Sequence, residues 1–550
     1  MFGASSLGFT FLVLAHIQIA WSYALPSKRS GEIRVEMNNA TYVGNQVDAQ
    51  DVFLGIPYAQ PPVGNLRFRK PVSFTPKGTI NVQSYGPRCL QSTIVSDASE
   101  DCLTLNIWRP HAVVEPLPVM VWIYGGSFIL GESQTYPGYG IVEKSIEMGQ
   151  PVIYVSMNYR LGFLGFPVGE QTMNKGAANL GLYDQRMAIE WVQNNIQYFG
   201  GDPTKVTLFG ESAGGISVSY QTMYQGGQIG NAFRAAIMQS GAPSSYKPSA
   251  QDSSARQQAY DQIASQTGCS KAPDSFECLR ALDVNKLQEA HVATYKLPQD
   301  FVAYANFPAA YGPVIISGDD FLPSSVASII QSGKYANIPI ISGSNLDDGT
   351  WFVGATNSSL DLIEFLNSSL PGLDIGLPPS ISSPMCALYP DIPAAGSPYN
   401  TGNETFGRSD NYKWAAAIVG DYLFTAPRRQ FIQAAASRGQ NVWSYMFSQP
   451  TAGAPPEYGI SHTSEISYVF RGLPSNATQE SKDVSDKMMQ YWINFATNLN
   501  PQPKGSNLPA WPTYGTLKNM LQLKANNYSV ISDTFREPGT QYTLNTILGG

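Results

Sequence analysis

One segment constrains the fold of this chain more than any other: residues 206–215, Val-Thr-Leu-Phe-Gly-Glu-Ser-Ala-Gly-Gly. The β-branched and aromatic run at its start predicts a buried strand, and Ser212 follows that strand between glycines. A Gly-x-Ser-x-Gly pattern in this context is typical of a sharp turn from a strand into a helix, which lifts the serine side chain clear of the backbone. The chain has 50 glycines in 550 residues, so the pattern alone can arise by chance. Its meaning depends on the strands and polar residues elsewhere in the sequence.

Apolar runs and helical periodicities alternate along the chain. Buried strands are predicted at residues 117–124, 151–159, 206–209, 235–239, 338–342 and 442–447. The spacing of apolar residues predicts a helix over 184–199 and a surface helix over 481–498. Because buried strands that alternate with helices form parallel sheets, the expected fold class is α/β, with a large central, mostly parallel sheet flanked by helices. The Pro-, Ser- and Gly-rich stretch 378–407 is expected to be a loop insertion.

The N-terminus and the sequons indicate an exported chain. Residues 7–20 are mostly apolar, and Ser22-Tyr23-Ala24 offers a small-x-small cleavage site. Residues 1–24 are therefore predicted to be a signal peptide and 25–550 a single domain, and the apolar run is short for a membrane anchor. Asparagines that precede x-Ser/Thr are candidate glycosylation sites: Asn39, Asn357, Asn367, Asn403, Asn476 and Asn527. We expect a secreted, extracellular glycoprotein without a stable membrane anchor.

Charge and cysteine usage exclude several classes of function. The net charge is −7 and no basic stripe is evident, which argues against a nucleic-acid partner. In an oxidising compartment the simplest pairing of the five cysteines joins Cys89 to Cys102 and Cys269 to Cys278, which leaves Cys386 free. Neither spacing is that of a zinc site, so we expect neither a metal nor a cofactor.

A serine hydroxyl is a weak nucleophile and needs a neighbouring base to activate it. Beyond the predicted signal peptide only His111, His291 and His462 are available. His111 lies in a proline-rich stretch, and His291 lies in a helix-like segment that reads as surface. His462 follows strand and turn signals in a loop, where a mobile, exposed imidazole is expected. His462 is therefore the candidate base, and the alternative is an ordinary loop residue.

The base needs an acid that orients it, and the acid is expected between serine and histidine in chain order. Asp347 and Asp348 follow the strand predicted at 338–342, in a glycine-bounded loop. Either carboxylate can accept the imidazole N–H and fix its tautomer. The alternative interpretation is a solvated acidic turn.

Backbone N–H groups that face the reacting carbonyl complete such a site. Gly125 and Gly126 follow the strand predicted at 117–124, and bare glycine amides can approach a carbonyl oxygen closely. The N–H of Ala213, at the start of the helix after Ser212, is the third candidate donor. A tight strand-to-loop turn is the alternative interpretation of the glycines. The candidate oxyanion loop, serine, acid and histidine follow one another in this order, each after a strand signal.

Longer motifs surround these residues: Phe-Leu-Gly-Ile-Pro-Tyr-Ala at 53–59, Ser-Glu-Asp-Cys-Leu-Thr-Leu-Asn at 99–106, Asn-Tyr-Arg-Leu-Gly-Phe at 158–163, Phe-Gly-Gly-Asp-Pro at 199–203, and Gly459-x-x-His462-x-x-Glu465. Through these motifs nearly all of the mature chain resembles the type-B carboxylesterase/lipase family, which includes fungal lipases, sterol esterases and cholinesterases. The resemblance implies an α/β-hydrolase fold with loop and helical insertions, and a single catalytic domain. It also implies ester hydrolysis through an acyl-enzyme, with Ser212 as nucleophile, His462 as base, and Gly125, Gly126 and Ala213 as the oxyanion hole.

The chain departs from the family pattern in two places. The family acid is usually glutamate, whereas Asp348 occupies that place here, with Asp347 as the alternative. In the family the loop between the first paired cysteines covers the acyl gorge as a lid, and it is long in lipases and sterol esterases. Here it spans only residues 90–101 and is mostly polar.

The short loop favours a carboxylesterase with an accessible site for a small-molecule or lipid ester. A lipase or sterol esterase of the same family is the first alternative. A catalytically silent binding protein on the same fold is a more distant one, against which the presence of both Ser212 and His462 argues.

Overall fold

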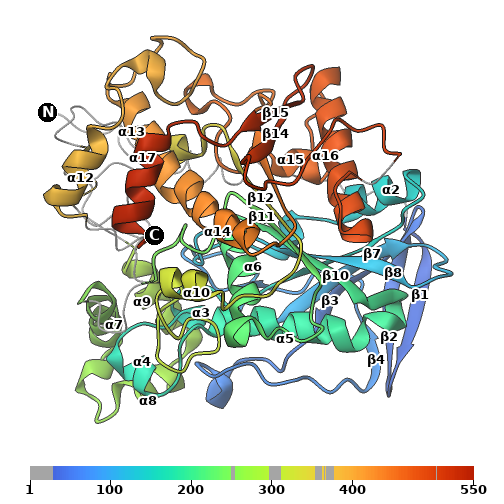
Figure 1. Cartoon of the computed structure of the whole chain (residues 1–550). Coiled ribbons are helices and arrows are strands. Elements are labelled where there is room, and N and C mark those ends of the chain that lie inside the picture. Colours follow the sequence, from blue (N-terminus) through green and yellow to red (C-terminus); the bar gives the residue numbers. More distant parts are fainter. Residues whose placement is uncertain are drawn as a thin grey trace, which may run out of the picture.

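The computed structural model describes residues 29–248, 254–295, 311–353, 362–363, 366, 377–502 and 505–549. Within these residues thirteen strands form one sheet through the middle of the molecule (Figure 1). The order across the sheet is β1 (Arg29–Met37), β2 (Ala40–Val47), β3 (Gln50–Pro57), β7 (Thr104–Pro110), β9 (Ile153–Met157), β8 (Leu117–Ile123), β10 (Gly201–Glu211), β11 (Ala235–Gln239), β12 (Ile340–Asn345), β13 (Val442–Phe447), β14 (Asn519–Leu523) and β15 (Ser529–Ser532), with β4 (Gly78–Asn81) paired to β2.

The centre of the sheet is parallel and its edges are antiparallel. Neighbouring strands from β9 to β14 in this order run parallel. At the two edges β1 with β2 and β14 with β15 are antiparallel, and β4 alone joins β2 in parallel within the described residues. Every residue of β9, β11, β12 and β13 is buried. Strands that are buried along their whole length are covered on both faces, so the predicted α/β class is confirmed.

Helices supply that cover. Figure 1 shows α2 (Tyr139–Glu147) and α16 (Gln479–Asn498) on one side of the sheet, and α5 (Leu180–Asn195) and α6 (Ala213–Met223) on the other. The remaining α-helices are α3 (Gly162–Gly165), α4 (Glu170–Asn174), α7 (Ser254–Thr267), α8 (Ser275–Ala281), α9 (Val284–Ala293), α10 (Val326–Ser332), α12 (Pro379–Cys386), α13 (Tyr412–Gly420), α14 (Ala426–Ser437), α15 (Ile466–Val469) and α17 (Glu537–Tyr542). A short sheet pairs β5 (Arg88–Cys89) with β6 (Ala98–Ser99).

Some element boundaries differ from the sequence prediction. The predicted helix over 184–199 begins earlier, at Leu180, and ends in a 3-10 turn. The predicted loop insertion over 378–407 contains α12, which starts on prolines at its first turn and buries Met385 and Cys386. The predicted surface helix is α16, and its apolar face is buried because Val484, Met488 and Trp492 recur at helical spacing.

Both predicted cysteine pairs form disulfides, Cys89–Cys102 and Cys269–Cys278, and Cys386 is free and buried. The predicted signal peptide and the sequons at Asn357 and Asn367 lie outside the described residues. The sequon asparagines within the described residues are exposed: Asn39, Asn403, Asn476 and Asn527.

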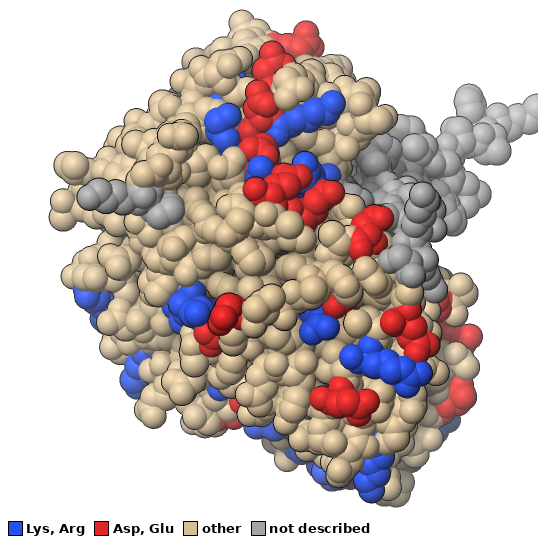
Figure 2. All heavy atoms as spheres, turned by 90° about the vertical axis from the view of Figure 1, so that its right-hand side faces the viewer, with Lys and Arg blue, Asp and Glu red and all other residues tan. Residues whose placement is uncertain are grey.

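The surface carries no dominant charge where Figure 2 displays it. Basic and acidic side chains are interspersed on that face. Among the helices that the structure describes, none combines the length and the apolar character needed to cross a bilayer.

Candidate active site

Ser212 occupies the turn between the end of β10 at Glu211 and the start of α6 at Ala213. Its φ of 55° and ψ of −126° are unusual for a residue with a side chain, and such strain is common at functional sites. A Cβ at Gly214 would lie 2.0 Å from the Ile123 carbonyl oxygen, so only glycine allows the start of α6 to pack against β8. The Ser212 side chain is partly exposed. The structure therefore contains the strand–turn–helix that the motif predicts.

His462 contacts Asp348 from across the site. The imidazole Nδ1 lies 2.9 Å from Asp348 Oδ1. Asp348 begins the 3-10 turn η6 (Asp348–Phe352), which follows β12, and its other oxygen accepts hydrogen bonds from Asn345 N at 2.8 Å and Ser240 Oγ at 3.0 Å. These two donors fix the carboxylate, so Oδ1 is aimed at the imidazole.

Asp347, the alternative acid, points elsewhere. Its Oδ1 accepts from Ser397 Oγ at 2.7 Å and from Tyr399 N at 2.9 Å, and its Oδ2 accepts from Ile460 N at 3.0 Å. Burial raises the pKa of Asp347 above its usual range. Its bonds join separate loops to one another, and the geometry thus separates the roles of two adjacent, identical residues.

The expectation that His462 is exposed is wrong. Only 3% of the residue is exposed. The rings of Trp351, Phe352 and Phe424 surround the imidazole, with centroids 6.2, 5.2 and 4.7 Å from its own. Phe424 belongs to a π-helical turn (Asp421–Thr425), a feature often found at functional sites. The aromatic rings and the Asp348 hydrogen bond together fix the orientation of the imidazole.

The second ring nitrogen of His462 faces Glu211, a residue that the sequence did not predict to belong to the site. Glu211 Oε1 lies 3.3 Å from Nε2, and within the described residues Nε2 makes no hydrogen bond. The only sequence signal was the position of this glutamate directly before Ser212. Ser212 therefore does not hydrogen-bond to Nε2 in this structure. Such catalytic bonds often form only when substrate is bound.

Three buried carboxyl groups surround the imidazole. Burial raises the pKa values of Glu211 and Glu465, and Glu465 accepts from Asn345 Nδ2 at 2.6 Å and from Gln239 Nε2 at 3.1 Å. Burial opposes the charged form of His462, but the Glu211 carboxyl and the Asp348 hydrogen bond outweigh it, so the pKa of His462 is raised. Glu211 and His462 therefore titrate as a coupled pair.

The loop after β8 lies against the turn that carries Ser212. A Cβ at Gly125 would be 2.6 Å from the Glu211 carbonyl oxygen and 2.9 Å from Ser212 Cβ. In the described part of the chain no backbone carbonyl accepts a hydrogen bond from the amide of Gly125 or Gly126. The Ala213 amide lies at the N-terminus of α6, where the helix dipole favours negative charge. These three predicted donors thus lie around the turn that carries Ser212.

The interpretation of His291 as a surface residue is also wrong. It lies in α9 and is 2% exposed, because its ring packs against Gly162 and Tyr311. Its Nε2 accepts a hydrogen bond from Phe163 N at 3.1 Å, and burial lowers its pKa to about 3. His111 is exposed, with Nδ1 2.8 Å from Asp51 Oδ1.

Comparisons with known proteins identify the family. The sequence profile of the Carboxylesterase family matches residues 31–542. A secreted triacylglycerol lipase, LIP1, of Gibberella zeae is 35% identical, over 94% of this chain and 90% of its own. Acetylcholinesterase of Bungarus fasciatus is 33% identical, over 88% of this chain and 82% of its own. The crystal structure of Aspergillus niger EstA superposes with a TM-score of 0.82 at 26% identity, and covers 94% of this chain and 98% of that one. The chain therefore has the α/β-hydrolase fold and belongs to the carboxylesterase family of serine ester hydrolases.

Proposed function

We propose that this protein is a secreted carboxylesterase that works through a Ser212–His462–Asp348 triad and an acyl-enzyme. The observation that carries the proposal is the 2.9 Å contact of His462 Nδ1 with Asp348 Oδ1, on an imidazole whose Nε2 faces the residue next to Ser212. In this assignment Asp348 holds the ring proton on Nδ1, which leaves the Nε2 lone pair to act as the base.

The reaction has two symmetrical halves. His462 Nε2 removes the Ser212 proton as Oγ attacks the ester carbonyl, and the amides of Gly125, Gly126 and Ala213 stabilise the resulting oxyanion. His462 then protonates the leaving alcohol. Water then attacks the acyl carbonyl carbon while it loses a proton to Nε2, and His462 returns this proton to Ser212 Oγ as the bond from Oγ to the acyl carbon breaks and the acid leaves. Each catalytic group in these reaction steps is a residue of the chain.

Export fits the same proposal. The two disulfides require an oxidising compartment, and a relative from Gibberella zeae is named as a secreted lipase. We propose that residues 1–24 direct secretion, that residues 25–550 form one catalytic domain, and that the exposed sequons carry glycans.

The Cys89–Cys102 loop supports a preference for soluble esters over lipid droplets. Arg67 pairs with Glu100 through two bonds of 2.6 and 2.7 Å, and both side chains are buried. The same guanidinium donates to the Leu282 carbonyl at 2.7 Å, beyond the end of α8. The loop is thus held at its base, and Ile94, 68% exposed, is its one large exposed apolar side chain. A fixed loop with so little apolar surface is poorly suited to opening onto a lipid interface.

A lipase is the second candidate, because curated relatives such as Lipase 2 of Geotrichum candidum, 34% identical, are named lipases. The two candidates differ in how rate depends on aggregation of the substrate. The test compares p-nitrophenyl acetate through palmitate, and follows tributyrin hydrolysis across its solubility limit. An esterase prefers short acyl chains and shows no jump in rate when droplets form. A preference for palmitate and emulsified triolein, with such a jump, would establish the lipase.

The triad itself is tested by labelling. A fluorophosphonate is expected to react with one equivalent of enzyme and abolish esterase activity. Ser212→Ala should neither react nor hydrolyse esters, although it should unfold at the same temperature as the wild type. Activity retained by Ser212→Ala would refute the assignment, and a wild type without esterase activity would favour a silent binding protein.

A further inference from the structure

The loop that carries Gly125 and Gly126 has a backbone that needs outside support. Between β8 and the 3-10 turn that begins at Ser133, Gly126, Ser127, Phe128 and Gly131 have φ values of 111°, 55°, 63° and 119°. Two of these residues carry side chains, for which such φ values are costly. A strained loop holds its amides in place only where neighbouring groups restrain it.

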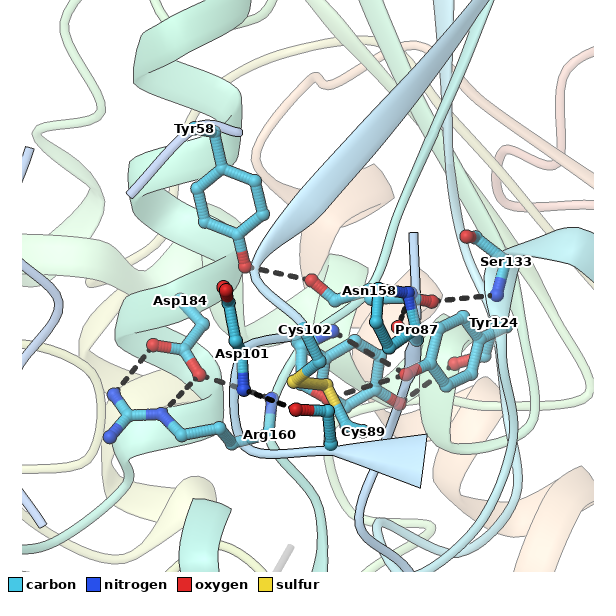
Figure 3. Close-up of a disulfide and its surroundings, with 12 residues drawn as sticks. Tyr58, Pro87, Cys89, Asp101, Cys102, Tyr124, Ser133, Asn158, Arg160 and Asp184 are labelled. Carbon is cyan, nitrogen blue, oxygen red and sulfur yellow. Dashed lines mark hydrogen bonds and ion pairs between the residues drawn. A yellow bond between two sulfur atoms is a disulfide. The ribbon is translucent and has the colours of Figure 1, made fainter. Parts of the chain in front are cut away.

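Two consecutive residues just after β9, Asn158 and Tyr159, hold both ends of this loop, and Figure 3 shows Asn158 with its bond to Ser133. At the start of the loop, Tyr159 Oη donates to the Tyr124 carbonyl at 2.9 Å, directly before Gly125. At the end, Asn158 Oδ1 accepts from Ser133 N at 2.9 Å. The rings of Tyr124 and Tyr159 are stacked, with centroids 4.5 Å apart.

Asn158 is itself fixed on three sides. Its Nδ2 donates to the Pro87 carbonyl at 3.0 Å, its backbone N–H donates to Thr104 O at 2.9 Å, and its carbonyl accepts from Tyr58 Oη at 2.7 Å. Pro87 and Thr104 each lie two residues outside the Cys89–Cys102 disulfide in the sequence. Through the hydrogen bonds of Asn158, the base of the disulfide loop and the end of β9 are therefore both connected to the loop after β8.

We propose that Asn158 and Tyr159 are positioning residues that hold the oxyanion amides at the distance that the transition state requires. The inference rests on the proposed function of Gly125 and Gly126. Neither side chain is assigned a contact with substrate. Because a displacement of about 1 Å in such a site costs about a hundredfold in rate, releasing one end of the loop should slow catalysis more than it weakens the fold.

The test compares two phenylalanine variants within one ring stack. Tyr159→Phe removes the bond to the start of the loop. Tyr124→Phe is the matched control, because it removes a hydroxyl from the same stack whose bonds, at 3.3 and 3.4 Å, go to the backbone of Tyr159 and not to the loop. Asn158→Ala releases the other end of the loop, so the proposal is tested even if one variant does not fold.

The readouts are kcat and KM for p-nitrophenyl butyrate, the inhibition constant of an alkyl trifluoromethyl ketone, and the unfolding temperature. The ketone adds Ser212 Oγ to its carbonyl carbon, and its oxygen becomes an oxyanion, so its affinity reports on the oxyanion hole. Tyr159→Phe and Asn158→Ala are expected to lower kcat by about ten- to a hundredfold. They should raise the inhibition constant by a similar factor with KM almost unchanged. Tyr124→Phe should alter kcat and the inhibition constant by less than threefold.

Two failures are distinguishable. Equal kcat and inhibition constants for Tyr159→Phe and Tyr124→Phe would overturn the positioning role, as would a loss of stability without a loss of kcat. If Ser212→Ala hydrolyses the ester in the same assay, the proposed function itself fails.

Discussion

Replacing Asp348 by asparagine is expected to fix His462 in the wrong tautomer. Asp348 Oδ2 accepts from Asn345 N at 2.8 Å, and a backbone N–H can only donate. In the variant the amide oxygen must therefore face Asn345, and the amide NH2 replaces the oxygen that faced His462 Nδ1. Because NH2 donates, Nδ1 must accept, and the ring proton moves to Nε2. Glu211 Oε1, 3.3 Å from Nε2, can accept a hydrogen bond from the resulting Nε2–H group, which stabilises the wrong tautomer further.

The size of the effect follows from this proton shift. With a hydrogen on Nε2, His462 cannot take the proton of Ser212. The corresponding substitution in a serine protease lowers kcat by about 10⁴, which corresponds to about 5.5 kcal/mol at about 1.4 kcal/mol for each factor of ten. We expect a loss of this order in kcat for Asp348→Asn, with KM changed by less than threefold. Initial rates with p-nitrophenyl butyrate at pH 8, together with an unfolding curve, measure both.

Asp347→Asn is the control, since the residue is adjacent, identical and equally buried. Its Oδ1 accepts a hydrogen bond from the backbone N–H of Tyr399, and its Oδ2 accepts one from the backbone N–H of Ile460. In the asparagine variant the NH2 group replaces one of these oxygens, so one of the two backbone N–H groups loses its acceptor. Leaving one buried donor unpaired costs about 1–3 kcal/mol of unfolding free energy, whereas kcat should stay within tenfold. The reasoning is refuted if Asp348→Asn keeps more than a tenth of wild-type kcat, or if Asp347→Asn shows the larger loss.

Three further outcomes are expected. Gly125→Ala places a Cβ within 2.9 Å of Ser212 Cβ and should lower kcat by about 10²–10³; an unchanged kcat for p-nitrophenyl butyrate would contradict the close approach. Glu211→Gln removes a carboxyl that raises the pKa of His462, so the acidic limb of the kcat/KM profile should move to lower pH. A limb that stays in place or moves to higher pH would show that Glu211 does not raise this pKa. Burial lowers the pKa of His291 from 6.5 to about 3, so the unfolded chain binds more protons below pH 6.5 and stability falls, by about 2 kcal/mol at pH 5. His291→Gln should therefore lose less unfolding free energy between pH 7 and 5 in urea titrations, and equal losses would disprove this.

The sequence predicts those elements best whose burial is uniform. The expected strands at 235–239 and 442–447 coincide with β11 and β13, where every residue is buried and the apolar run marks both ends. β10 is less well predicted, because it begins at Gly201 and its register with β8 shifts before Val206. Periodicity cannot reveal such a shift, since it depends on the neighbouring strand.

The surroundings of the two histidines show a different limit. His462 could be selected by elimination, but its burial depends on Trp351, Phe352 and Phe424, which lie far from it in the sequence. No local pattern connects these positions. His291 is buried for a similar reason, because Gly162, on a distant segment, leaves room for its ring. A loop or helix context predicts exposure only on average.

Asp348 stands where the family usually has glutamate. The way in which the loops that carry Asp348 and His462 are joined explains why the shorter side chain fits. Asp347 N donates to Ile460 O at 3.0 Å, and Ile460 N donates back to Asp347 Oδ2 at the same distance, so the acid loop and the histidine loop are paired. A Cβ at Gly349 would lie 2.1 Å from the Ala416 carbonyl oxygen, which means that η6 packs directly on the backbone of α13. Backbone contacts on both sides thus set how far Asp348 lies from His462. Because that spacing is fixed by the loops, the shorter side chain reaches Nδ1 at 2.9 Å, and a longer acid would have to bend to fit.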